Sequence, residues 1–390
     1  MINYDRVLSR SAAAIPPSGI RKFFDIVSEM KDAISLGVGE PDFVTPWAIR
    51  EAGIYALEKG RTHYTSNAGL TELRCEISRY LKRKYATEYD PDSEIIVTIG
   101  GSEAIDIALR SIIEPGDEVL IPEPSFVCYK PCTALAGGVP VPVVTEEKDN
   151  FKLTPEKLLS KITPKTKALV LPFPNNPTGA IMEKEDLEKI AEILKDTDII
   201  VLSDEIYSEL TYGKQHVSFA SLPGMRERTV TINGFSKSFA MTGWRLGYAA
   251  APKELSAVMK KIHQYAIMCA PTTSQFAAVE ALKSCDEDVE RMCREYNYRR
   301  RVMVEGFRKM GLSCFEPEGA FYVFPNISSV GFTSEEFAAK LLDEEKVAVV
   351  PGTAFGSSGE GFVRCSYAYS IKNIEEALRR ISNFVAKHKK

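Results

Sequence analysis

Between residues 94 and 250, the chain alternates short apolar runs, rich in β-branched residues, with longer stretches of helical periodicity. Nearly continuous apolar strands that are separated by helices are typical of a mostly parallel sheet covered on both faces. The pattern therefore predicts a large α/β domain. The predicted strands are residues 94–98, 118–121, 168–172, 199–203, 229–233 and 246–250.

Two of the helices between these strands can be located from their sequences. Thr154 is a capping residue before a proline at the first helical position, and Leu158, Leu159 and Ile162 are predicted to share one face of that helix. Apolar residues that recur at three- and four-residue spacing predict a second amphipathic helix. They are Leu187, Ile190, Ala191 and Leu194.

The pattern changes near residue 288, where one long helix is predicted over residues 288–310. Beyond it, short strands mixed with helices predict a smaller α+β unit. The strands are expected at 320–325, 347–350 and 361–368, and the helices at 334–345 and 373–388. The first residues have no place in the sheet order and are expected to pack against this unit. The predicted parts are an N-terminal segment at 1–45, a large domain at 46–287 and a small domain at 288–390.

Composition excludes several classes of protein. The 390 residues include 49 basic and 53 acidic side chains, so no basic excess indicates nucleic-acid binding. No apolar run reaches the roughly 18 residues of a membrane helix, and the N-terminus lacks the apolar core of a secretory signal. Eight cysteines without a Cys-x-x-Cys pair, and four histidines, favour reduced thiols over disulfides or a structural zinc site. We therefore expect a cytoplasmic protein that binds neither nucleic acid nor membrane.

Polar side chains follow three consecutive predicted strands. Because ligands of open α/β sheets bind outside the carboxyl ends of the strands, Asn176, Asp204 and Lys237 are predicted to point into one crevice. Taken singly, each has an ordinary explanation as a turn, a helix cap or a solvated lysine. Their order and their matched positions favour a ligand site. The segments concerned are residues 175–179, 203–207 and 234–238, followed by a fourth at 242–247.

The run SKSFAMTGWR at residues 236–245, together with the polar segments before it, resembles the class I and II aminotransferases of pyridoxal-phosphate fold type I. The likeness is greatest to the subgroup of bacterial and archaeal aspartate and aromatic aminotransferases, and it extends from residues 35–43 to 362–368. The resemblance implies a large domain with a mostly parallel seven-stranded sheet and a smaller α+β domain built from both termini. It also implies the cofactor pyridoxal 5'-phosphate and a homodimer with shared active sites.

The same resemblance assigns roles around the cofactor ring. Lys237 holds the cofactor as a Schiff base and, once released, moves a proton, which requires an amine that is partly neutral. Asp204 pairs with the pyridine nitrogen and keeps it protonated. Asn176 and Tyr207 donate hydrogen bonds to the 3-hydroxyl oxygen, and Phe126 stacks on the ring. Lys237, Asp204 and Tyr207 are thus the expected catalytic residues.

The phosphate of the cofactor is expected at the start of the helix that follows strand 94–98. Gly100, Gly101 and Ser102 precede a helix that is expected to begin at Glu103, where free N–H groups and the helix dipole attract an anion. By resemblance, Ser236 and Arg245 complete the phosphate site. Tyr64 is implied to reach the phosphate of the neighbouring subunit.

Substrate recognition is implied to fall to Arg364, whose guanidinium can bind an α-carboxylate through two parallel hydrogen bonds. Gly39 and Asn176 are expected beside it. Acid-specialised members of the subgroup can carry a lysine at the position of Ser102, and the segment 15–20, expected to border the pocket, is largely apolar. These departures favour an aromatic or broad-range amino-acid donor, with aspartate as an open alternative. The acceptor is expected to be 2-oxoglutarate, in a ping-pong reaction.

Three other functions are compatible with parts of the sequence. A pyridoxal-phosphate lyase that cleaves C–S bonds uses the same lysine, aspartate and arginine, although the run at 242–245 favours transamination. A cofactor-sensing domain of a transcription regulator needs an added DNA-binding module, and only about forty residues precede the sheet region. A dinucleotide-binding dehydrogenase is disfavoured because residues 37–39 lack the third glycine and a proline follows at 41.

Overall fold

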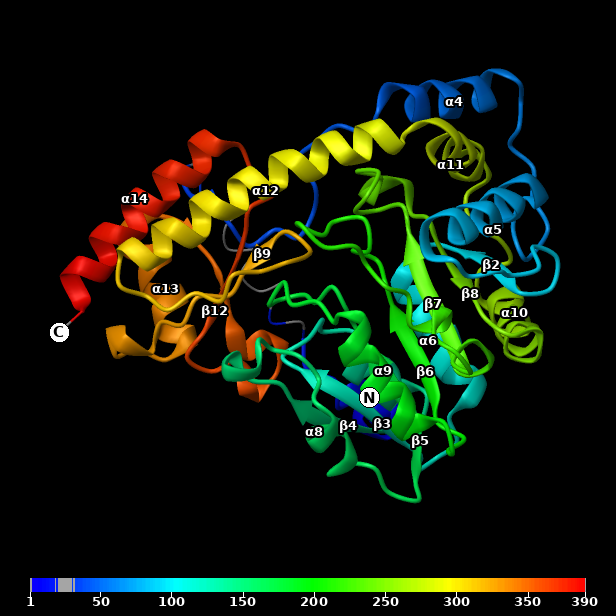
Figure 1. Cartoon of the computed structure of the whole chain (residues 1–390), viewed down its shortest axis with the longest axis horizontal. Coiled ribbons are helices and arrows are strands. Elements are labelled where there is room, and N and C mark those ends of the chain that lie inside the picture. Colours follow the sequence, from blue (N-terminus) through cyan, green and yellow to red (C-terminus); the bar gives the residue numbers. More distant parts are fainter. Residues whose placement is uncertain (1, 18, 20–29, 31, 390) are drawn as a thin grey trace.

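The computed structural model describes residues 2–17, 19, 30 and 32–389. A large sheet domain and a smaller C-terminal unit lie side by side, and the long helix α12 (Asp286–Lys309) runs along both of them (Figure 1). This helix confirms the one that the sequence predicts at 288–310.

The large domain is built on a mixed sheet of seven strands within the described chain, in the order β2-β8-β7-β6-β5-β3-β4. β8 is antiparallel to both of its neighbours, and the other pairs are parallel. The mostly parallel sheet that the sequence predicts is therefore confirmed. The strands are β2 (Ile95–Thr98), β3 (Glu118–Glu123), β4 (Val139–Val144), β5 (Thr166–Leu171), β6 (Ile200–Asp204), β7 (Thr229–Gly234) and β8 (Gly247–Ala250).

One of these strands, β4, is absent from the strands that were located by sequence. Its sequence VPVPVV contains Pro140 and Pro142, which usually interrupt a strand because they cannot donate to the ladder. β4 lies at the edge of the sheet, where it pairs with β3 alone, and an edge strand tolerates proline.

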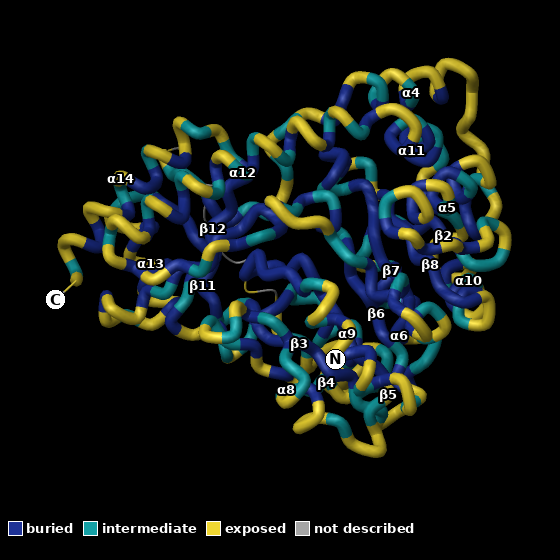
Figure 2. The backbone as a smooth tube through the Cα atoms, in the orientation of Figure 1, coloured by how far each residue is buried: buried dark blue, intermediate teal, exposed yellow. Residues whose placement is uncertain are grey.

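Both faces of the sheet are covered, so the strands bury side chains in both directions. On one face, Val119, Ala168 and Leu202 pack with helices α6, α7 and α10; on the other, Leu120 and Leu169 pack with α8 and α9. Figure 2 accordingly shows β6 and β7 as buried. The helices are α4 (Trp47–Glu58), α5 (Thr71–Tyr85), α6 (Gly101–Ile112), α7 (Tyr129–Leu135), α8 (Pro155–Leu159), α9 (Lys184–Leu194), α10 (Lys253–Ala266) and α11 (Thr272–Ser284).

Helix α8 is shorter than the sequence pattern predicts. Thr154 caps it as expected, since its side chain accepts a hydrogen bond from the N–H of Lys157. The helix ends at Leu159, however, so only Leu158 faces the core. The prediction of a three-residue apolar face was therefore wrong: Leu159 is exposed and Ile162 lies beyond the helix.

The C-terminal unit contains a three-stranded antiparallel sheet in the order β11-β12-β9, whose outer strands contact helix α13 and the long helix α12. The strands predicted at 320–325 and 361–368 are shorter, because neighbouring residues make only isolated bridges. The single strand predicted at 347–350 was wrong, since these residues are divided between β10 and β11, which belong to different sheets. The N-terminal strand β1 (Ile34–Ser35) pairs with β10 of this unit, whereas helix α2 (Arg10–Ala13) contacts α7 of the sheet domain. The boundaries at residues 45 and 287 stay predictions. The elements are β9 (Tyr322–Val323), α13 (Ser334–Glu345), β10 (Val347–Ala348), β11 (Val350–Pro351), β12 (Val363–Ser366) and α14 (Ile371–His388).

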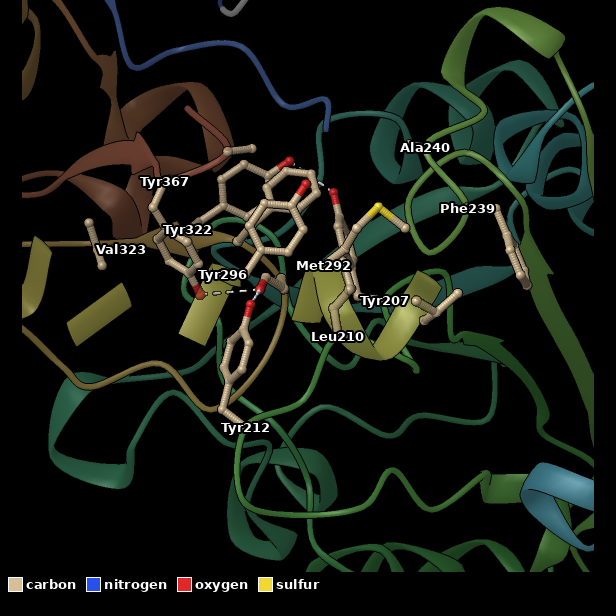
Figure 3. Close-up of a cluster of buried hydrophobic side chains, with 14 of the residues drawn as sticks. Tyr207, Leu210, Tyr212, Phe239, Ala240, Met292, Tyr296, Tyr322, Val323 and Tyr367 are labelled. Atoms are coloured by element: carbon tan, nitrogen blue, oxygen red, sulfur yellow. Dashed lines mark hydrogen bonds between the residues drawn. The ribbon is translucent and has the colours of Figure 1, made fainter. Parts of the chain in front are cut away.

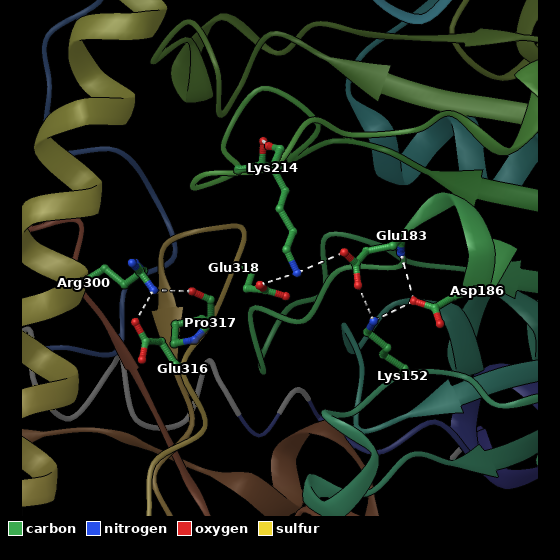
Figure 4. A network of polar contacts seen from close by, with 9 residues as sticks. Lys152, Glu183, Asp186, Lys214, Arg300, Glu316, Pro317 and Glu318 are labelled. Atoms are coloured by element: carbon green, nitrogen blue, oxygen red, sulfur yellow. Dashed lines mark hydrogen bonds and ion pairs between the residues drawn. The ribbon is translucent and has the colours of Figure 1, made fainter.

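Ion pairs connect the sheet domain to the segment that leads into β9. Lys214 lies between Glu183 at the start of α9, at 3.1 Å, and Glu318, at 2.7 Å (Figure 4). On the far side, Arg300 of α12 bonds Glu316 and the carbonyl oxygen of Pro317. These partly exposed pairs each contribute little stability, about 0–1 kcal/mol, but together they hold residues 316–318 between the two parts.

The fold also bears on the predictions about disulfides and membrane helices. The eight cysteines form no disulfide within the described residues, which agrees with reduced thiols. In the same part of the chain, every helix is too short or too polar to span a bilayer.

Candidate active site

A cavity of about 350 Å³ lies at the carboxyl ends of β5, β6 and β7, where residues from the C-terminal unit close one side of it. Three consecutive strands do bring Asn176, Asp204 and Lys237 to one cavity, as the sequence predicts. The predicted site residues that line it are Gly39, Gly101, Ser102, Phe126, Asn176, Asp204, Tyr207, Ser236, Lys237, Arg245 and Arg364.

Tyr64 and the described residues of the segment 15–20 do not line the cavity of their own chain. The predicted contact of Tyr64 is with the neighbouring subunit, and it stays a prediction. Tyr64 is 81% exposed and is not among the described residues that line the cavity. In the segment 15–20, Ser18 and Ile20 lie outside the described residues, and Gly19 packs against Ala354 rather than lining the cavity. A role for Tyr64 therefore requires a second subunit.

Lys237 follows β7, and its Nζ donates a hydrogen bond to the carbonyl oxygen of Gly39 at 2.6 Å. Burial lowers the pKa of this amine to about 8, and the positive charges of Arg364 and Arg245 act in the same direction. A substantial fraction of the amine is consequently neutral near physiological pH. Lys237 thus meets the requirement for a nucleophile and for a base.

Asp204 is the last residue of β6 and is buried in the wall of the cavity. Burial raises the pKa of its carboxyl group to about 6, although two hydrogen bonds oppose this shift. The Tyr129 hydroxyl donates to Oδ2 at 2.7 Å, and the N–H of Ile206 donates to Oδ1 at 3.2 Å. A buried carboxylate of this kind favours a protonated, positively charged ligand group in the cavity.

Tyr129 is a site residue that sequence reasoning missed. It is buried in the first turn of α7, lines the cavity and contacts Asp204 from 75 positions away in the sequence. Phe126 lies before the helix that Tyr129 begins, so helical spacing does not connect the two residues. In sequence, Tyr129 therefore looks like a core tyrosine.

We predict that Tyr129→Phe raises the pKa of Asp204 further, because the ionised carboxylate loses a donor. A cofactor that pairs with the carboxylate then loses affinity as the pH falls, and the midpoint of this loss moves up by about one pH unit. Pyridoxal-phosphate affinity measured against pH tests this. Tyr80→Phe is the matched control, since the buried Tyr80 hydroxyl binds Glu209 outside the cavity. Equal midpoints in Tyr129→Phe and the unmodified protein would contradict the assignment.

The opposite end of the cavity can hold an anion. Helix α6 begins at Gly101, so the N–H groups of its first turn have no acceptor within the helix. Gly100 before it has a φ of 135°, and a Cβ there would lie 3.1 Å from Nη2 of Arg245. Glycine thus allows the guanidinium to approach the helix start. Arg245 and the N–H groups of Gly101 and Ser102 together make a positive site that Ser236 also borders.

Arg364 lies on β12 and is buried, with 2% of its surface exposed. Its Nη1 donates to Oδ1 of Asn176 at 2.9 Å, and its Nη2 donates to the carbonyl oxygen of Gly37. Its Nε is buried without a hydrogen-bond partner among the described residues. Because an unpaired buried donor is costly, this guanidinium is suited to an anionic ligand that enters from the cavity.

The family model described as aminotransferase class I and II matches residues 31–381 of this chain. The chain belongs to this family. Membership makes it a pyridoxal-phosphate-dependent aminotransferase, which acts on amino acids and 2-oxo acids. The sequence-based family, fold type, enzyme class and cofactor are thereby confirmed.

Relatives of this aminotransferase are similar along almost its whole length. It is 57% identical to YugH of Bacillus subtilis over 97% of this chain and 98% of that one. It is 48% identical to the aspartate aminotransferase of Pyrococcus abyssi, over 96% and 97% of the two chains. The crystal structure of the aromatic aminotransferase from Pyrococcus horikoshii superposes with a TM-score of 0.91 at 47% identity, over 94% and 99% of the two chains.

The cavity of this aminotransferase fits pyridoxal 5'-phosphate at its phosphate, its ring nitrogen and its aldehyde carbon. The positive site at the start of α6 suits the phosphate, and the buried Asp204 suits a protonated pyridine nitrogen. The partly neutral Lys237 suits the aldehyde carbon. Phe126 supplies an aromatic wall between these ends.

Proposed function

We propose that this aminotransferase moves the amino group of aromatic and other L-amino acids to 2-oxoglutarate, and that it prefers donors without a second carboxylate. The observation that carries the proposal is the small number of positively charged side chains in the described cavity lining. In the part of the chain that the structure describes, the basic residues of the lining are Lys237, Arg245 and Arg364. Each of them has a task, so the described lining offers no further cation to the distal carboxylate of a donor such as aspartate. The acceptor 2-oxoglutarate also has a distal carboxylate, and in this proposal that group binds without a dedicated cation. Ser102 stands where acid-specialised relatives can carry a lysine.

Lys237 carries the proton transfer in this proposal. When bound, pyridoxal phosphate supplies an electron sink for the pair released as the Cα–H bond of the amino acid breaks. The neutral Nζ of Lys237 takes the proton from Cα and later delivers it on the cofactor side. A water molecule then supplies the keto oxygen of the oxo acid, which leaves while the amino group stays with the cofactor. The pKa of about 8 supports this role, because the amine can both accept and release a proton near neutral pH.

Asp204, Asn176 and Tyr207 tune the cofactor ring in the proposal. The buried carboxylate of Asp204 keeps the ring nitrogen protonated, which makes the ring a stronger electron sink. Asn176 and Tyr207 donate hydrogen bonds to the 3-oxygen and stabilise its negative charge. The position of all three side chains in the cavity lining supports these roles.

Arg364 orients the substrate by binding its α-carboxylate, with Asn176 and the backbone of Gly39 beside it. The bond between Nη1 and the Asn176 amide holds the guanidinium in one orientation. Every α-amino acid and every 2-oxo acid presents this carboxylate, so the same contact serves both halves of the ping-pong reaction. Arg364 therefore fixes the position of Cα next to Lys237 without selecting among side chains.

The visible absorption spectrum of the pyridoxal-phosphate-loaded protein tests the proposal. Tyrosine, phenylalanine, aspartate and glutamate are added separately, without an oxo acid. We expect the band of the lysine-bound cofactor to give way to that of the pyridoxamine form, faster with tyrosine and phenylalanine than with aspartate. A faster reaction with aspartate would contradict the preference, and a protein that releases ammonia with the oxo acid would be a lyase.

We predict that Ser102→Lys raises kcat/KM for aspartate relative to tyrosine by about tenfold, because a new ammonium group can bind the distal carboxylate. Ser102→Ala is the control, since it removes the same hydroxyl from the phosphate site without adding charge. Steady-state rates with both donors at fixed 2-oxoglutarate provide the measurement. If the ratio is the same in both variants, the distal carboxylate does not approach position 102.

We also propose that two copies of the chain share their active sites. Exposed aromatic side chains lie on α4 (Trp47 and Tyr55), in the loop after α4 (Tyr64, 81% exposed) and on α10 (Tyr265, 88% exposed). Exposed apolar surface of this kind marks protein interfaces. We expect a dimer by sedimentation. A mixture of Lys237→Ala and Tyr64→Ala chains should regain activity that neither variant has alone, and no regain would exclude a shared site.

A further inference from the structure

Tyr322, which sequence reasoning did not single out, connects the two residues that are proposed to bind the cofactor oxygen and the substrate carboxylate. It lies on β9 of the C-terminal unit, is buried and lines the cavity. Its hydroxyl oxygen is 2.8 Å from that of Tyr207, which follows β6 of the sheet domain (Figure 3). Its ring lies 4.4 Å from Cζ of Arg364.

The two tyrosine hydroxyls have one proton between their oxygens. Burial raises the pKa of both Tyr207 and Tyr322, so both phenols stay protonated. One O–H therefore lies along the 2.8 Å line, and the other points elsewhere. If Tyr322 donates, the proton of Tyr207 is free to point into the cavity. A hydroxyl that accepts one hydrogen bond is also a stronger donor in the next.

The surroundings of the Tyr322 hydroxyl are tightly filled. A Cβ at Gly39 would lie 2.5 Å from its oxygen, so glycine leaves the space that the hydroxyl occupies. The carbonyl oxygen of Gly39 in turn accepts the hydrogen bond from Lys237. The Tyr322 hydroxyl is therefore held between the Tyr207 hydroxyl and the backbone of Gly39, which is hydrogen-bonded to Lys237.

The ring of Tyr322 has a separate task. The guanidinium of Arg364 lies between this ring, at 4.4 Å, and the ring of Phe355, at 4.9 Å. Two aromatic faces hold the planar guanidinium and leave its edges for hydrogen bonds. Phe355 has no hydroxyl, so the chain contains a matched pair of rings that differ in this one respect.

We propose that Tyr322 is a positioning residue with two separable parts. Its ring holds the Arg364 guanidinium for the substrate carboxylate, and its hydroxyl directs the proton of Tyr207 toward the 3-oxygen of the cofactor. The inference rests on the proposed function for the roles of Arg364 and Tyr207. It adds a residue of the C-terminal unit to the environment of the cofactor ring.

Three variants separate the two parts. In Tyr322→Phe the ring remains, so binding of 3-phenylpropionate, a carboxylate without an amino group, should change less than about twofold, whereas the pH midpoint of the visible band should rise by about half a unit. The midpoint rises because the 3-oxygen loses part of its stabilisation. In Tyr322→Leu the midpoint should rise equally, and binding should weaken about tenfold. In Phe355→Leu binding should weaken with the midpoint unchanged.

The midpoint is measured on the pyridoxal-phosphate-loaded protein without any amino acid, which separates this inference from the proposed function. An unchanged midpoint in Tyr322→Phe would overturn the role of the hydroxyl. Undiminished 3-phenylpropionate binding in Tyr322→Leu, in a variant whose far-ultraviolet circular dichroism matches the unmodified protein, would overturn the role of the ring. If the midpoint shifts as expected while no amino acid bleaches the band, the inference stands and the proposed reaction fails.

Discussion

Lys237→Ala is expected to abolish amino-group transfer, with a fall in kcat of about 10⁴-fold or more, because one side chain supplies both the covalent attachment of the cofactor and the base. No second amine is available to replace it, since the other basic residues of the described lining are the guanidinium groups of Arg245 and Arg364. A guanidinium stays protonated at any pH at which proteins are folded and cannot act as a base.

The control for this prediction is Lys237→Arg, which keeps a long cationic side chain but cannot become neutral. Both variants should bind pyridoxal phosphate without forming the lysine-bound absorption band, and both should lack transfer between tyrosine and 2-oxoglutarate. Activity that returns when a small primary amine is added to Lys237→Ala would support the role of base. Transfer at the unmodified rate in either variant would exclude Lys237 as the catalytic amine.

Arg364→Leu is expected to lower kcat/KM by about 10²- to 10³-fold for every amino-acid donor, because the substrate carboxylate loses its charged partner in a buried site. The substitution also leaves Oδ1 of Asn176 and the carbonyl oxygen of Gly37 without the donors that now bind them. The loss should be similar for tyrosine and aspartate, since both present the same α-carboxylate.

Arg364→Lys is the matched control for charge. It keeps a cation but loses the planar fork and the contact with two aromatic faces, so a loss between those of the leucine variant and the unmodified protein is expected. Steady-state kinetics with both donors measure the effect, and the absorption band of the lysine-bound cofactor reports whether the cofactor site is intact. A loss confined to aspartate would mean that Arg364 binds the distal carboxylate instead.

The sequence predicted a strand correctly where the strand's own residues carry the pattern, and it missed the strand whose place in the sheet explains its residues. The runs 168–172 and 199–203 are apolar except for Ser203, and they correspond to β5 and β6 because a strand buried on both faces leaves that pattern by itself. β4 was not located because Pro140 and Pro142 are acceptable only at a sheet edge. Which strand lies at the edge is a property of the whole sheet and cannot be read from six residues.

The residues of the active site also divide into those that the sequence predicts and those that it does not. Asn176, Asp204 and Lys237 could be predicted to meet, since each follows a strand and neighbouring parallel strands end at one edge of a sheet. Tyr129 and Tyr322 could not, because each looks like an ordinary core aromatic in sequence. Their contacts join residues that are 75 and 115 positions apart, to Asp204 and Tyr207 respectively.

The sequence by itself determined the α/β sheet domain, the family and the strand-end residues that line the cavity, because hydrophobic periodicity and short motifs are local properties of the chain. Only the tertiary structure decided how these residues are supported. It placed Tyr129 behind Asp204 and put the guanidinium of Arg364 between two rings of the C-terminal unit. It also left Tyr64 outside the cavity of its own chain. Such contacts arise from the packing of distant segments, and packing depends on the whole fold rather than on any one segment.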